Sequence, residues 1–337
     1  MSDSHLQAGE AAYKLGNIEN AASICRAGIA EAQSAKDEVQ VLRLRTLLSQ
    51  CHWVKGEYEA ALLLTEPSSS DSPGMLDPHT KAQLLNQRGF AFTQLGRFAE
   101  AREMLEEALR LAATSGFFQV ISHIEINRAT LFFYLCDYES VETCGRSALA
   151  IAVEFRFAEV EASASAAIGK SLMYRQRWAE AVPWYERSVE VFARNGFDYY
   201  AMSMRADLGA CHFALYEDEK ADRLFTQALQ NSRDVGALAR YHIDLANMGC
   251  LHLRRGEHRA ALDHFQEAVD IARKLGDSIS TVKWLCNLTL THSCMGNPDL
   301  AAVCENEAMR IQRRVVQARA AAAAPSSISA ACAARDR

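Results

Sequence analysis

The chain has 337 residues, 49% of them hydrophobic and 23% charged, and a formal net charge of −6. This acidic balance argues against nucleic acid as a partner, because binding it requires a basic surface that displaces counterions from phosphates. No stretch approaches the roughly 18 consecutive apolar residues of a membrane span. Residues 1–5 also lack the basic and apolar regions of a secretory signal. We therefore expect a cytoplasmic protein that binds neither nucleic acid nor a membrane.

A short helical pattern recurs every 40 residues along almost the whole chain. The residue that closes the first helix of each unit marks the period: Gly16, Gly56, Gly96, Cys136, Gln176, Tyr216, Gly256 and Gly296. Columns of mostly small residues lie seven positions before, five after and twelve after this marker. Small residues at a constant period indicate places where two helix backbones approach closely, so the pattern predicts an array of eight helical repeats.

The clearest unit spans residues 246–269. Its first helix shows the i, i+3, i+4, i+7 spacing of a single buried face, which begins at Leu245. Gly256 suits the turn, because a helix commonly ends on a residue in the left-handed region, where glycine has no steric penalty. The second helix carries its own apolar stripe around Phe265 and stops before Gly276.

This pattern resembles the tetratricopeptide repeat, a helix-turn-helix unit, in a form six residues longer than the common one of about 34 residues. The matching positions are the Gly249, Ala261, Phe265 and Ala268 types, and a set of aromatic residues follows the turn: Tyr58, Phe98, Tyr138 and Trp178. The resemblance covers residues 1 to about 315. It implies an all-α, right-handed α-solenoid of about eight repeats with a C-terminal capping helix.

We expect the array to occupy residues 1–321, with turns near the eight markers. A break is predicted at residues 66–78, because three prolines there cannot lie inside a helix, and the preceding helix should stop near Thr65. This loop is either a flexible joint or interaction segment, or a tolerated surface loop. Residues 322–337 are expected to form a disordered tail.

No motif in the chain indicates catalysis: we find no P-loop, Gly-rich dinucleotide turn, HExxH or nucleophile elbow. We therefore expect neither an enzyme nor a cofactor. The ten cysteines show no CxxC pair, which is typical of free thiols in a reducing compartment.

Four histidines occupy one column of the repeat: His52, His212, His252 and His292. Stacked helices lie on the order of 10 Å apart, whereas ligands of one zinc ion lie at about 2.0–2.3 Å from it. We therefore expect packing residues and no metal site. Sensing of pH by a buried histidine column remains an open alternative.

A stripe on the first helices, at 13, 9, 6 and 2 positions before the marker, is not used by the core. In tetratricopeptide folds this stripe lines the concave groove, and the resemblance implies that an asparagine nine positions before the marker binds a peptide backbone through its amide donor and acceptor. The alternative is that this amide is solvated or bridges neighbouring helices. The candidate groove residues are Arg43, Trp53, Gln87, Gln94, Asn127, Tyr134, Lys170, Tyr174, Asn247, Arg254, Lys283 and Asn287.

The sequence thus predicts a non-catalytic scaffold or adaptor that binds a protein or peptide segment in the concave groove. The mixture of aromatic and basic residues suits a ligand with apolar anchors and some acidic residues. The alternative is a sensory module for signalling, as in bacterial relatives of this fold, which controls a separate transcription regulator or cyclase through the last helix. Self-assembly of the terminal repeats is a third possibility, so we expect a monomer or a weak homo-oligomer.

Overall fold

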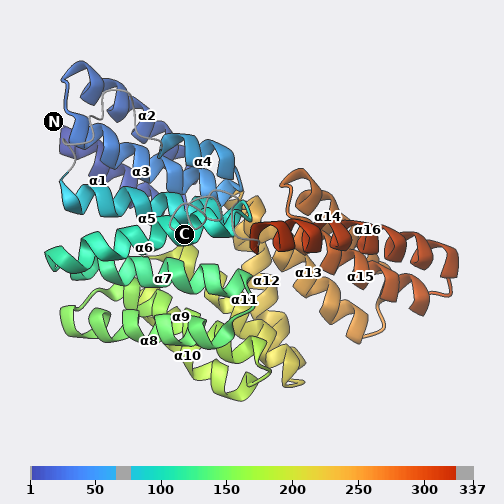
Figure 1. Ribbon diagram of the computed structural model, residues 1–337. Coiled ribbons are helices and arrows are strands. Elements are labelled where there is room, and N and C mark those ends of the chain that lie inside the picture. Colours follow the sequence, from blue (N-terminus) through green and yellow to red (C-terminus); the bar gives the residue numbers. More distant parts are fainter. Residues whose placement is uncertain (1, 66–76, 324–337) are drawn as a thin grey trace, which may run out of the picture.

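The computed structural model describes residues 2–65 and 77–323 (Figure 1). Within these ranges every secondary-structure element is a helix, sixteen in all, and the predicted all-α solenoid is confirmed. Residues 66–76 of the predicted break and 324–337 of the predicted tail lie outside the described residues. None of the described helices is long and apolar enough to cross a membrane.

The helices follow one another in antiparallel pairs, two per 40-residue unit, which we number one to eight. Their bounds are α1 (Ser2–Lys14), α2 (Ile18–Ser34), α3 (Glu38–Lys55), α4 (Tyr58–Leu64), α5 (Pro78–Gln94), α6 (Phe98–Ser115), α7 (Phe118–Tyr134), α8 (Tyr138–Phe155), α9 (Ala158–Tyr174), α10 (Trp178–Arg194), α11 (Asp198–Ala214), α12 (Asp218–Asp234), α13 (Leu238–Arg254), α14 (His258–Lys274), α15 (Ser278–Cys294) and α16 (Pro298–Ala323). Helix α4 ends one residue before Thr65 and α16 continues to Ala323.

Each turn between the two helices of a unit places its marker residue in the left-handed region, with φ between 60° and 80°. At Gly256 (φ 77°), the glycine N–H donates to the Leu253 carbonyl at 3.1 Å, and the N–H of Glu257 donates to the His252 carbonyl at 2.9 Å. These two bonds satisfy carbonyls left open at the end of α13. Cys136, Gln176 and Tyr216 adopt the same φ with a side chain present.

The core lies between the paired helices, where in units five to seven a glycine of the first helix receives a ring from the second. A Cβ atom on Gly249 would lie 2.7 Å from Phe265 Cε1, and one on Gly209 would lie 2.8 Å from Phe225 Cε1. Both phenylalanines are buried. Any side chain at these two glycines would therefore push the helices of the unit apart.

The solenoid curves until its first units meet its sixth and seventh. The Tyr13 hydroxyl lies 2.9 Å from the Tyr200 hydroxyl, although 187 residues separate them. A Cβ atom on Gly56 would lie 2.7 Å from Leu275. Ala237, at the start of α13, is fully buried in the same core cluster as α1 to α3. Helix α3 thus contacts α13.

The left-handed turns give a direct test of the repeat geometry. We expect Gly256→Ala to lower the free energy of unfolding by about 1 kcal/mol, because a Cβ is unfavourable at positive φ. Space is not the cause, since no atom lies within 4 Å of the added Cβ. Urea denaturation followed by circular dichroism measures the change. Gln176→Ala is the control, because Gln176 already has a Cβ at φ 60° and should lose almost nothing. Equal losses in the two variants would contradict this explanation.

Candidate functional site

Aromatic side chains from α7, α8 and α9 meet on the inner face of units four and five. The Phe133 ring centre lies 4.7 Å from that of Tyr174, edge to face, and Tyr174 lies 5.5 Å from Tyr138. Tyr134, beside Phe133, donates its hydroxyl hydrogen to Gln94 Oε1 at 2.9 Å. We call the four rings of Phe133, Tyr134, Tyr138 and Tyr174 the inner cluster. Gln94, Tyr134 and Tyr174 were predicted from the sequence, and the structure brings them to this one region.

Two of the predicted lysines lie over rings of the inner cluster. The Lys170 Nζ atom is 5.0 Å from the centre of the Phe133 ring, and Lys283 Nζ is 5.8 Å from that of Tyr174. Such contacts contribute about 0.5–1 kcal/mol at exposed sites and more where water is excluded. Lys283 comes from α15 and Tyr174 from α9. The curvature of the solenoid therefore brings units five and eight to one place.

Burial sets the protonation of the phenols in this region. It raises the pKa of Tyr174 to about 12, with the Asp207 carboxylate as a further cause. Burial likewise raises the pKa of Tyr58 to about 12. Both phenols are therefore neutral at physiological pH and can donate a hydrogen bond to a ligand oxygen.

Two of the predicted asparagines bridge neighbouring units. Asn127 Nδ2 donates to Asn86 Oδ1 at 2.9 Å, and Asn287 Nδ2 lies 3.6 Å from Cys250 Sγ. This bridging is the alternative left open in the sequence analysis. Asn247 is half-buried and forms no side-chain hydrogen bond with the described residues. Its amide donor and acceptor are therefore not taken up by the described part of the chain.

Arg254 is held by its own chain. Its Nη1 atom lies 2.6 Å from Asp218 Oδ1, it donates to the Phe213 carbonyl at 2.7 Å, and its guanidinium covers the Phe213 ring at 3.2 Å. The side chain thus joins α13 to unit six, and a ligand would have to compete with Asp218 for it.

The remaining predicted residues lie in units two and three. Arg43 is exposed on α3, and the Trp53 ring lies tilted against that of Phe90 with ring centres 4.4 Å apart. The Trp53 Nε1 donor and the Gln87 Oε1 acceptor are buried and have no hydrogen-bond partner in the described part of the chain. An unpaired buried polar atom costs about 1–3 kcal/mol. Within the described ranges, Trp53 and Gln87 thus each keep an unpaired polar atom, and neither they nor Arg43 contributes to the inner cluster.

A buried charge cluster between units six and seven was not predicted from the sequence. Arg240 Nη2 lies 3.0 Å from Asp207 Oδ1, and its Nε lies 2.9 Å from Asp244 Oδ1. Burial alone would lower the pKa of Arg240, but the Asp244 and Asp207 carboxylates outweigh it and raise that pKa. The guanidinium is therefore permanently charged. Asp207 occupies the column nine positions before the marker, where most other units have an amide. This carboxylate in place of an amide was the sequence signal that could have revealed the charge cluster.

Three histidines of the repeat column form hydrogen bonds that were not predicted from the sequence. His52, His212 and His252 each contact a glutamate five residues later through Nδ1; the His212–Glu217 distance is 2.5 Å. Each glutamate directly follows its turn marker, whereas Asn297 occupies that position in the unit of His292. The co-occurrence of histidine and glutamate within a unit could have revealed these pairs.

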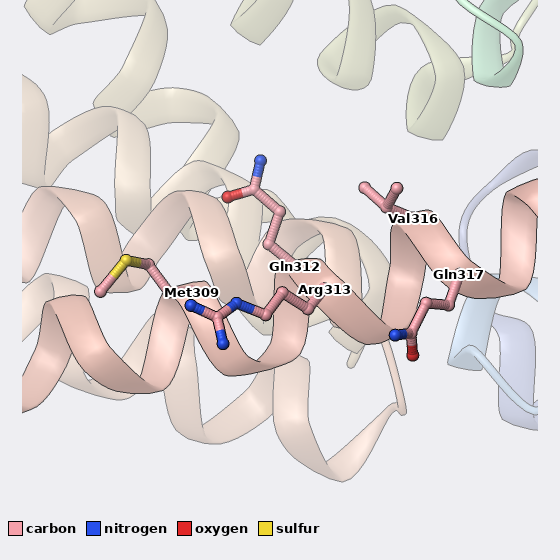
Figure 2. Close-up of a pocket in the computed structure, with 5 residues that line it drawn as sticks. All are labelled: Met309, Gln312, Arg313, Val316 and Gln317. Atoms are coloured by element: carbon pink, nitrogen blue, oxygen red, sulfur yellow. The ribbon is translucent and has the colours of Figure 1, made fainter.

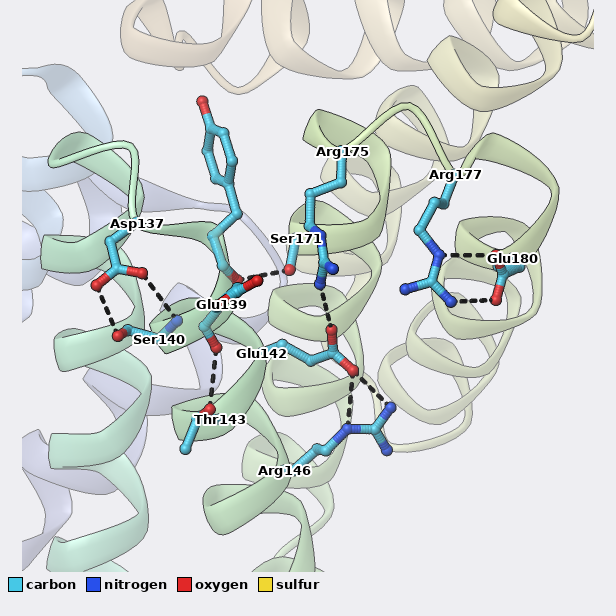
Figure 3. Close-up of polar contacts among 11 residues, drawn as sticks. Asp137, Glu139, Ser140, Glu142, Thr143, Arg146, Ser171, Arg175, Arg177 and Glu180 are labelled. Carbon is cyan, nitrogen blue, oxygen red and sulfur yellow. Dashed lines mark hydrogen bonds and ion pairs between the residues drawn. The ribbon is translucent and has the colours of Figure 1, made fainter.

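Polar contacts link α8 to α9 and to the turn that follows α9, and others cap α8 (Figure 3). Ser171 Oγ donates to the Tyr138 carbonyl at 2.7 Å, and Glu142 accepts from both Arg146 and Arg175 at 2.7 and 3.1 Å. Asp137 caps α8 by accepting from the Ser140 N–H and hydroxyl. The hydrogen bond from the Ser140 side chain is the main cause of the lowered pKa of Asp137. These contacts fix the rings of Tyr138 and Tyr174 relative to each other.

Among the described residues, no three His, Cys, Asp or Glu side chains are arranged to hold a metal ion. The nine cysteines in this part of the chain are free thiols.

Removal of Arg240 tests the buried charge cluster. We expect Arg240→Met to destabilise the protein by about 3–5 kcal/mol, because two carboxylates would remain buried without their cation. Arg255→Met is the matched control: Arg255 also joins α13 to unit six, 2.8 Å from Asp222, but both side chains are about one-third exposed. Its loss should be within about 1 kcal/mol. Urea denaturation of both variants measures the difference, and equal losses would contradict the assignment.

Comparison with known proteins gives a consistent family and fold. Two family models, both described as tetratricopeptide repeat, match residues 82–115 and 241–314. The photosystem I assembly protein Ycf3 of Synechococcus elongatus is 30% identical over 105 residues, which are 29% of this chain and 57% of that protein. The same protein of a second Synechococcus strain matches equally. The chain thus spans little more than half the length of these relatives.

Solved structures resemble the chain over most of its length. A Rap protein complexed with competence and sporulation factor superposes with a TM-score of 0.66 at 11% identity, covering 94% of this chain and 99% of that one. The Rap conjugation gene regulator of plasmid pLS20, in complex with the Phr* peptide, gives 0.67 at 10%, covering 87% and 80%. Aspartyl phosphate phosphatase F from Bacillus subtilis gives 0.62 at 10%, covering 93% and 94%. At these identities the likeness concerns the fold alone.

Proposed function

This chain belongs to the tetratricopeptide repeat family, and we propose that it is a non-catalytic interaction scaffold whose inner face binds a peptide or an extended segment of another protein. Two structures of similar fold are complexes of Rap proteins, one with competence and sporulation factor and one with the Phr* peptide. Their likeness makes a peptide a reasonable ligand to test. The residues of the inner face supply the argument for this chain.

The observation that carries the proposal is the inner cluster with lysines over its rings. Rigid aromatic side chains bury large apolar area at low entropic cost, which makes them typical anchors of an interface. Lys170 forms no ion pair with the described residues, in a chain whose net charge is −6. A ligand with large apolar side chains near acidic groups would complement both features.

A display library of random peptides tests the proposal. We expect the wild-type protein to enrich peptides with apolar and acidic residues, and the double variant Tyr174→Ala, Asn247→Ala to bind them at least ten-fold more weakly, since it loses a ring anchor and an amide. Fluorescence anisotropy of the enriched peptides measures the affinities. Arg110→Ala is the control. The Arg110 side chain is 74% exposed and lies on α6, the second helix of its unit, whereas Tyr174 and Asn247 lie on first helices. Unchanged affinity in the double variant would refute the proposal.

The second candidate, a sensory module that acts on a separate output protein, is favoured by the last helix. Helix α16 exposes Val303 by 62%, Val316 by 56% and Met309 by 40%. Met309 and Val316, with Gln312, Arg313 and Gln317, line a shallow pocket of about 400 Å³ (Figure 2). Exposed apolar side chains next to a cation on a terminal helix suit a docking surface for another protein.

Charged substitutions on α16 distinguish the two candidates. If the sensory function holds, Met309→Asp with Val316→Asp should lose a protein that the wild type retains from native lysate, while the inner-face double variant keeps it. Quantitative mass spectrometry of the retained proteins measures this. The same retained set for the wild type and the α16 variant would count against the sensory candidate. Light scattering of both proteins tests self-association through α16.

A further inference from the structure

A cavity of about 180 Å³ lies in the inner face next to the inner cluster. It is lined by side chains of α7 to α11, among them Ile126, Phe133, Lys170, Phe192, Tyr200 and Met204. The Phe192 and Tyr200 rings stack with centres 5.3 Å apart and form one wall. The Tyr200 hydroxyl is hydrogen-bonded to the Tyr13 hydroxyl. The contact that closes the solenoid therefore also fixes this wall.

The cavity exists because α9 is unusually poor in large side chains. Ser163, Ala166 and Ala167 line it, within a run of small residues in that helix. Ala167 lies in the column nine positions before the marker, where the other units have Gln7, Leu47, Gln87, Asn127, Asp207, Asn247 and Asn287. In unit five alone, this column therefore leaves the space of a side chain unfilled.

The volume suits a small apolar group. A cavity of about 150 Å³ lined by aliphatic and aromatic side chains remains dry and binds benzene. The present cavity is slightly larger and its lining is mainly apolar. The polar Thr130 hydroxyl in its wall already donates to the Ile126 carbonyl at 3.1 Å. A phenyl ring or a branched chain of similar size would therefore fill it by hydrophobic burial.

The positive charge of Lys170 further restricts which ligands the cavity can bind. Lys170 is the one charged side chain in the lining, it is half-buried, and it forms no ion pair with any described residue. Its Nζ atom lies over the Phe133 ring, which also lines the cavity. A carboxylate placed there would gain a charge-assisted hydrogen bond from the ammonium group. An amide or an alcohol at the same place would not gain the ionic part.

We propose that this cavity is a binding site for small apolar carboxylates, with the apolar group beside Ala167 and the carboxylate on Lys170. The site shares Phe133 and Lys170 with the face proposed to bind an extended segment, but binding of a free acid does not require such a segment. Bound acid would also hold the Tyr200 wall in place, and with it the contact to Tyr13.

Isothermal titration calorimetry of the full chain with 3-phenylpropionate and 4-methylpentanoate, each beside its primary amide, tests the proposal. We expect the acids to bind the wild type at least ten-fold more tightly than the amides. Lys170→Met should abolish this preference, and Lys14→Met should preserve it, because Lys14 also lies 5.0 Å from a ring, that of Phe197, but does not line the cavity.

A variant whose added side chain fills the cavity provides the second arm of this test. Ala167→Leu should abolish binding of both acid and amide, and Leu47 in the same column of unit two indicates that the fold accepts leucine there. Circular dichroism and thermal unfolding confirm that this variant is folded. Equal affinity for acid and amide in the wild type, or wild-type binding by Ala167→Leu, would overturn the proposal. Binding of Leu- or Phe-containing peptides without binding of the free acids would also overturn it, and would make the cavity an anchor pocket for a peptide.

Discussion

Helices α1 and α3 pack against the segment from α11 to α14, although most of the chain lies between them. In a repeat array each unit ordinarily contacts only its neighbours. Here the Tyr13–Tyr200 hydrogen bond and the approach of Gly56 to Leu275 add a long-range contact that the stacking of neighbours does not require. A small rotation per unit, summed over several units, brings these surfaces together. The shape of the inner face depends on this closure.

Closure changes the chemistry of the inner face. It brings Lys283 from unit eight to Tyr174 of unit five, and it places Tyr200 as a wall of the cavity next to Lys170. Between the neighbouring units six and seven, independently of closure, Arg240 is neutralised by two aspartates and Arg254 by Asp218. The groups left for a ligand are rings, amides and the Lys170 ammonium. This combination favours an apolar ligand with a negative charge over a cationic one.

The 40-residue period of the sequence was sufficient to predict the helical solenoid, because each unit repeats the same small and apolar positions. The eight turns, the helix pairs and the stop of α4 before Thr65 all follow from local rules of glycine and proline. The contact of Tyr13 with Tyr200 could not be predicted, since it depends on the exact rotation between units. For the same reason the stripe predicted Arg254 and Asn127 as groove residues but did not reveal their partners, Asp218 and Asn86. The cavity depended on Ala167, a small residue whose meaning appears only once its neighbours are placed.

Cross-linking of the closure contact tests the account most directly. A Cβ atom on Gly16 would lie 3.9 Å from Val235 Cβ, close to the separation of about 3.8 Å in disulfides, and Cys136 shows that cysteine can occupy a marker position at φ 62°. We predict that Gly16→Cys with Val235→Cys forms a disulfide under mild oxidation, identified by peptide mapping. Gly96→Cys with Val235→Cys should not, since no atom lies within 4 Å of a Cβ on Gly96. Absence of the first disulfide in folded protein would show that the solenoid is open, contradicting the account.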